Sequence, residues 1–82
     1  MRIAFDELVP DGEEVVRVRL CWSRQEADLV GAALTARGLD YAEEEALEGW
    51  SVYTSGSDAP RALAVLESLG LDRTESVYNA GL

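Results

Sequence analysis

Apolar and polar residues alternate between Val15 and Trp22, which is the pattern of a strand with one buried face. The side chains expected toward the core are Val16, Val18, Leu20 and Trp22. Those expected on the opposite face are Val15, Arg17, Arg19 and Cys21. This strand is the first regular element that the pattern predicts after residue 14.

Two later segments change to the spacing of three and four residues that is typical of an amphipathic helix. The first follows Ser23 and Glu26, which have the spacing of a capping box, and its apolar stripe is Ala27, Val30, Ala33 and Leu34. It is expected to end at Gly38. The second carries Pro60 in its first turn and the stripe Ala62, Val65, Leu66 and Leu69, and it is expected to end at Gly70.

Three further segments are interpreted as strands. Residues 50–54 alternate clearly, whereas residues 39–45 alternate poorly and carry Glu43, Glu44 and Glu45, which suits an exposed edge strand. A short last strand is predicted at residues 76–78. The three glutamates also allow a divalent-cation site, but neighbouring strand residues point to opposite faces, so a solvated edge is the preferred interpretation and no metal site is predicted.

Residues 1–14 stand apart from this pattern. The sequence VPDG at residues 9–12 is typical of a turn, and the residues before it could form an additional strand. We expect this N-terminal extension to cover a sheet edge, to lie elsewhere on the domain or to pair with another subunit.

The predicted order β-α-β-β-α-β indicates an α+β fold, a ferredoxin-like sandwich in which both helices cover one face of a four-stranded antiparallel sheet. Residues 1–82 would form a single domain with its core at residues 15–78 and an N-terminal extension. Right-handed crossovers would make the first and third strands parallel neighbours, so we expect both helix N-termini at one end of the molecule.

The composition of the chain excludes several classes of function but does not identify one. The 82 residues contain seven basic residues, all arginine, against 16 acidic ones, which gives a net charge of −9 and disfavours nucleic-acid partners and anionic membranes. With no histidine and one cysteine, the chain cannot build a usual zinc site, and imidazole and lysine catalysis are excluded, so neither a cofactor nor an enzymatic activity is expected. No segment is long and apolar enough to cross a bilayer, and a cytoplasmic location is expected.

Residues 15–70 contain a pattern made of Glu26 and Ala27, of Gly38 with Leu39, and of a later set at Val52, Asp58, Ala62 and Leu66. In this pattern the chain resembles a family of small prokaryotic domains known as putative signal-transducing proteins. The resemblance implies a bacterial protein with a ferredoxin-like fold related to nitrogen-regulator PII domains. These are positions that carry the fold, so the resemblance brings no catalytic residue.

The shared helix end suggests a small-anion or nucleotide site, because free backbone N–H groups and the helix dipole attract anions. Its candidate residues are Ser23, Arg24, Ser55, Gly56, Ser57 and Arg61. The alternative is that Glu26 and Asp58 satisfy the same groups as ordinary caps.

The face of the sheet away from the helices is the second candidate surface. The residues expected there are Arg17, Arg19, Tyr41, Tyr53 and Tyr78, and such residues commonly anchor protein interfaces. We therefore expect a non-catalytic binding or regulatory domain that acts through a protein partner or a homodimer. The alternatives are the anion sensor and, less favoured, a small phosphate-ester or acyl-phosphate hydrolase that would use Arg24.

Overall fold

A computed structural model describes residues 1–70 of the chain. It contains three helices and three strands in this range: α1 (Phe5–Leu8), β1 (Val15–Cys21), α2 (Arg24–Ala36), β2 (Ala42–Ala46), β3 (Gly49–Ser55) and α3 (Ala59–Ser68). The two long helices and the three strands lie where the sequence pattern predicts them. The predicted strand at residues 76–78, and Tyr78 with it, lies outside the described residues.

The described fold is α+β and is built on a three-stranded antiparallel sheet with the order β1-β3-β2. It therefore does not contain the four strands of the expected ferredoxin-like sandwich. The first and third strands are neighbours, as expected, but they run antiparallel, with Val15 opposite Ser55 and Cys21 opposite Trp50. The expectation of parallel neighbours is wrong.

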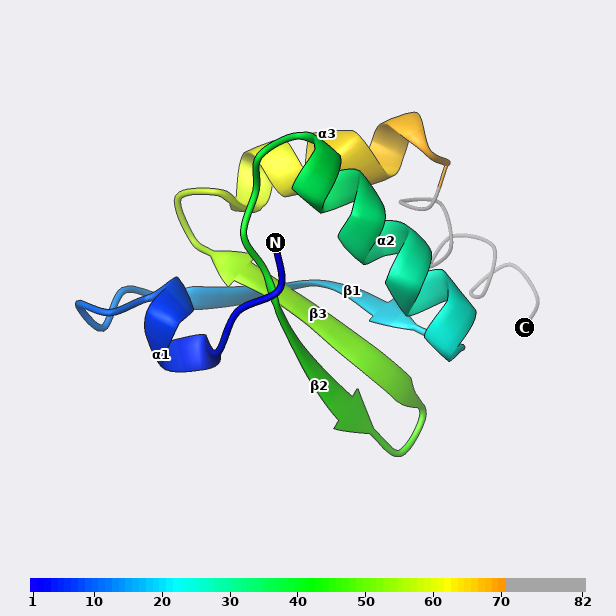
Figure 1. Cartoon of the computed structure of the whole chain (residues 1–82), viewed down its shortest axis with the longest axis horizontal. Coiled ribbons are helices and arrows are strands. Elements are labelled where there is room, and N and C mark those ends of the chain that lie inside the picture. The colour runs from blue at the N-terminus through cyan, green and yellow to red at the C-terminus, as the bar shows by residue number, and fades with distance from the viewer. Residues whose placement is uncertain (71–82) are drawn as a thin grey trace, which may run out of the picture.

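Antiparallel pairing separates the two helix starts. Helix α2 follows the Cys21 end of β1, whereas α3 follows the Ser55 end of β3, and these are opposite ends of the sheet. Figure 1 shows the two helices side by side above the sheet, starting at opposite ends. The expected common end for both helix N-termini therefore does not exist.

A β-bulge in β1 changes which side chains face the core. The register shifts between Arg17 and Arg19, so seven residues of β1 oppose six of β3. Because paired residues share a face, Arg17 lies with Tyr53 on the outer face, while Arg19 lies with Val52 on the helix-covered face. Cys21 is fully buried in the core as a result, and the plain alternation expected for this strand is wrong beyond the bulge.

The core fills the space between the sheet and the two long helices. Its fully buried members include Val30 and Leu34 of α2, Ala62 and Leu66 of α3, and Val52 of β3. Burial of these side chains supplies the main stabilisation of the helices, which would be marginal in isolation at 13 and 10 residues.

The N-terminal extension covers one edge of the sheet and part of its outer face. Arg2 forms a parallel bridge with Tyr41, and backbone hydrogen bonds of 2.8 and 3.0 Å join Ile3 N–H to the Tyr41 carbonyl and Tyr41 N–H to the Met1 carbonyl. Helix α1 then lies on the side of the sheet away from α2 and α3 (Figure 1), where the Phe5 and Tyr53 rings meet edge to face at 5.0 Å. The sequence alone suggested that the outer face of the sheet is free. In the structure, α1 covers part of this face.

Candidate functional site

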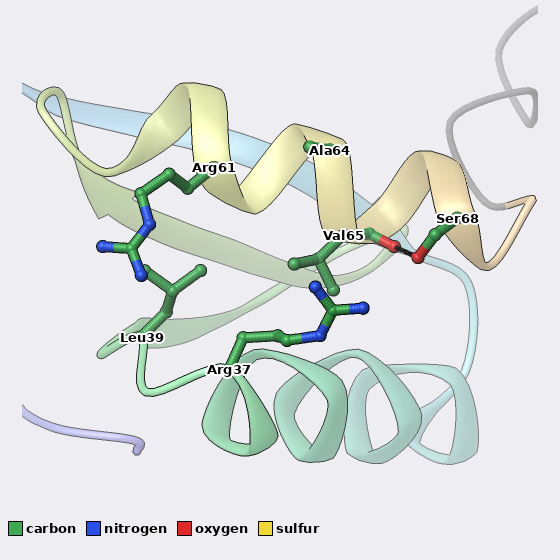
Figure 2. Close-up of a pocket in the computed structure, with 6 residues that line it drawn as sticks. All are labelled: Arg37, Leu39, Arg61, Ala64, Val65 and Ser68. Carbon is green, nitrogen blue, oxygen red and sulfur yellow. Dashed lines mark hydrogen bonds between the residues drawn. The ribbon is translucent and has the colours of Figure 1, made fainter.

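The groove between α2 and α3 combines basic and apolar side chains on an acidic protein. Its volume is about 260 Å³, and Figure 2 shows the side chains that line it: Arg37, Leu39, Arg61, Ala64, Val65 and Ser68. We call it the α2–α3 groove. The two guanidinium groups extend from opposite helices into the space between them, over the buried side chains of Leu39 and Val65.

The end of α2 positions one wall of the groove. Arg37 is the last residue before Gly38, whose φ of 73° is the left-handed conformation that glycine adopts most readily. The turn brings Leu39 back under the helix, where its N–H donates to the Leu34 carbonyl at 3.0 Å. Leu39 is thereby buried while Arg37 stays exposed at the rim.

The other wall is a stripe along α3. Arg61, Ala64, Val65 and Ser68 have the i, i+3, i+4, i+7 spacing that places residues on one helix face. The Ser68 hydroxyl donates to the Val65 carbonyl at 2.6 Å, so this polar group is already satisfied by the helix itself. The charge available to a ligand on this wall is that of Arg61.

Both arginines of the groove keep most of their capacity to bind an anion. Arg61 lies 3.8 Å from the Asp58 carboxylate, and its side chain is 65% exposed, so this i,i+3 ion pair is weak. Within residues 1–70, Arg37 forms neither an ion pair nor a side-chain hydrogen bond. Two guanidinium groups beside an apolar floor can bind carboxylate or phosphate groups attached to an apolar body.

The six residues predicted to form one anion site lie in two groups. Ser23 and Arg24 stand at the start of α2, where the Ser23 hydroxyl accepts from Glu26 N–H at 3.1 Å and Glu26 accepts from Trp22 N–H at 3.2 Å. The capping interpretation is confirmed at this end. Arg24 contacts the carboxylates of Asp28 and Glu43 at 3.3 and 3.1 Å.

The second group lies at the start of α3, at the other end of the sheet. Gly56 N–H donates to the Glu14 carbonyl at 2.8 Å, Ser57 N–H donates to the Glu13 carboxylate at 3.1 Å, and the Ser55 and Ser57 hydroxyls lie 3.3 Å apart. The Glu13 carboxylate thus already occupies the loop before α3. Asp58, the N-cap residue of α3, makes no side-chain capping hydrogen bond, so the capping interpretation is wrong at this end. Only Arg61 of the six predicted residues contributes to the α2–α3 groove.

The predicted outer-face surface is also divided. Arg17 is exposed there and Tyr53 is half-buried beside Phe5, but Arg19 and Tyr41 are both 9% exposed and face the helices. Arg19 turns inward because of the bulge. Tyr41 fits against α2 because residue 31 is glycine, since a Cβ there would overlap the tyrosine ring.

Glutamates 43–45 do not form a metal centre in the structure. Glu43 and Glu45 lie on the helix-covered face and Glu44 on the other. Of the three, Glu43 alone is enclosed, with its side chain 3% exposed, and it pairs with Arg2 at 3.5 Å and Arg24 at 3.1 Å. Among residues 1–70 no group of three histidine, cysteine or acidic side chains could hold a metal ion. In the same range, no helix has the length and apolar character needed to cross a membrane.

Five residues of the groove were not predicted from the sequence: Arg37, Leu39, Ala64, Val65 and Ser68. The signal that could have found them is the pair Arg37–Gly38 at a helix end together with the stripe that begins at Arg61. Comparisons of the chain with protein-family models, with curated proteins and with solved structures find no match.

Proposed function

We propose that this protein is a small non-catalytic binding or regulatory domain that recognises an acidic segment of a protein partner in the α2–α3 groove. The observation that carries the proposal is the placement of Arg37 and Arg61 on both sides of an apolar floor, in a chain with a net charge of −9. Charge complementarity of this kind gives an interface its specificity and speeds association.

The openness of the groove favours a protein segment over a small molecule. Small-molecule sites are usually enclosed and bury most of the ligand surface, whereas Arg37, Arg61, Ala64 and Ser68 are all exposed. A volume of about 260 Å³ holds only a few side chains. A partner that continues beyond the groove would bury more surface than a compact anion could.

The finer expectations from the sequence remain proposals. They are the resemblance to small prokaryotic signal-transducing domains and a cytoplasmic location. Of the expected fold, the structure supports only the coarser α+β class, with two helices on one face of an antiparallel sheet.

The proposal is tested by titrating the ¹⁵N-labelled protein with a short acetylated peptide of alternating Glu and Leu. We expect amide shifts concentrated at residues 37–39 and 61–68, and a loss of these shifts in the double variant R37Q/R61Q. The matched control is the same peptide with Gln in place of Glu. Absence of shifts up to millimolar peptide would contradict the proposal.

Inorganic phosphate, sulfate and nucleotides form a second arm of the same titration. They separate recognition of a protein segment from a small-anion sensor. Shifts that saturate with phosphate alone, at residues 23–27 or 55–61, would favour the sensor and overturn our assignment of the groove.

A further inference from the structure

The turn between β2 and β3 presents an acidic and apolar tip with the chemistry that complements the groove. Leu47 is fully exposed, and it is flanked by Glu45 and Glu48, which are also exposed. A single exposed leucine is common on a protein surface, so the interest of Leu47 lies in the acidic side chains beside it and in the surface that they complement. We call Glu45, Leu47 and Glu48 the acidic tip.

The acidic tip complements the groove in its apolar surface and in its charge. Leu47 would cover the apolar floor formed by Leu39 and Val65, and the two glutamates would lie near Arg37 and Arg61. An apolar contact flanked by ion pairs is the common anatomy of an interface, with a dry centre and a charged rim. The tip carries these groups on a short hairpin that the β2–β3 pairing holds in place, with Glu45 opposite Trp50.

The positions of tip and groove prevent a chain from filling its own groove. The tip lies at the Trp50 end of the sheet, next to Cys21, whereas Arg37 and Arg61 lie toward the end of α2 and the start of α3, at the opposite end. Figure 1 shows the β2–β3 turn on the side of the molecule away from α3. The tip can therefore enter only the groove of another molecule.

We propose that the acidic segment recognised by the α2–α3 groove is the acidic tip of a second copy of this chain. This inference rests on the proposed function and names its partner. The contact is head-to-tail, because it joins the tip of one copy to the groove of the next, so it can build rings or open chains. Its area is small, and we expect association at high micromolar to millimolar concentration.

The first test measures the weight-average mass by analytical ultracentrifugation at about 0.15 M salt, where the repulsion between acidic surfaces is largely screened. The mass should rise above 8.9 kDa with concentration. The variant L47D should weaken association at least tenfold, whereas L29D adds the same charge at another exposed leucine and should leave it unchanged. A wild-type protein that stays monomeric at 1 mM overturns the inference.

The second test reverses charge on each side separately. The variants R37E/R61E and E45R/E48R should each stay monomeric, because groove and tip then carry like charges. An equimolar mixture should associate again, since each variant keeps one partner of the original contact. Circular dichroism of each variant checks that it is folded, and a mixture of folded variants that stays monomeric would refute the head-to-tail contact.

The two proposals fail in different ways. If the Glu–Leu peptide shifts the groove residues but the protein remains monomeric, the groove binds an acidic partner other than this chain. If the protein associates but L47D has no effect, the self-contact uses another surface and the acidic tip is not its basis.

Discussion

Cys21 is a thiol that its surroundings keep protonated. Its side chain has no exposed surface, and burial together with the nearby Glu26 carboxylate raises its pKa to about 11, against the opposing effect of Arg19. The thiolate is the reactive form of cysteine, so a raised pKa makes this residue unreactive at neutral pH. The position suits a small core residue.

We predict that Cys21 resists labelling by a disulfide reagent at pH 8 in the native protein and reacts once the protein is unfolded in guanidinium. The folded state holds the thiol proton more tightly than the unfolded state, whose pKa is near 9. The stability should therefore fall as pH rises from about 9 toward 11. A C21A variant should lose part of this dependence, and rapid labelling of the native protein would disprove the assignment.

In the first turn of α2, the carboxylate of Glu26 makes two different interactions. Glu26 accepts from the Trp22 backbone, and it also pairs with the Arg19 guanidinium, whose Nε lies 2.7 Å from Oε2. The side chains of Arg19 and Glu26 are 7% and 18% exposed, so the pair is nearly enclosed. Loss of one member leaves an uncompensated charge next to the core.

We expect E26A to lower the free energy of unfolding by about 3 kcal/mol, because it removes both the carboxylate that accepts from Trp22 N–H and the counterion of Arg19. E26Q keeps a hydrogen-bond acceptor and should cost less. The double variant R19M/E26Q should be more stable than E26A, since no buried charge remains. Urea denaturation measures all three, and equal loss in E26A and R19M/E26Q would show that the charge is not the main factor.

Across the whole molecule, the Glu43 carboxylate connects three parts of the chain. It lies on β2 and contacts Arg2 of the N-terminal segment and Arg24 of α2, while its own side chain is 3% exposed. Each arginine is about half exposed, and either one could neutralise the carboxylate alone. The packing of the N-terminal segment on β2 is therefore coupled, through Glu43, to the packing of the start of α2 on β2.

Because both arginines neutralise Glu43, the effects of replacing them on the free energy of unfolding should not be additive. R2A and R24A should each cost about 1 kcal/mol or less, whereas R2A/R24A should exceed the sum of the two by about 1 kcal/mol, because Glu43 then has no counterion. Thermal or urea unfolding of the four proteins gives the coupling energy. Repeating the cycle with E43Q should abolish it, and simple additivity in the original background would exclude the coupling.

The sequence indicated the helices well because α2 and α3 bury one apolar stripe each, and residues such as Val30 and Leu66 mark it plainly. It could not indicate that β1 and β3 run antiparallel, since direction depends on which strands pair. This direction places Arg24, at the start of α2, and Arg61, at the start of α3, at opposite ends of the sheet. Nor did it show that Tyr41 lies inside, which depends on the space left by Gly31. The groove was missed because Arg37 and Arg61 come from segments that meet only in the folded chain.

The extra residue in β1 changes which positions of this strand correspond to those of a strand without a bulge. Before Val18 the even-numbered positions face the helices, and after it the odd-numbered positions do, as the pairs Val16 with Thr54 and Cys21 with Trp50 show. An uninterrupted strand of the same pattern would have to be aligned with a one-residue gap at Val18. Without that gap, an inward arginine and a core thiol would be mistaken for surface residues, and outward positions for core.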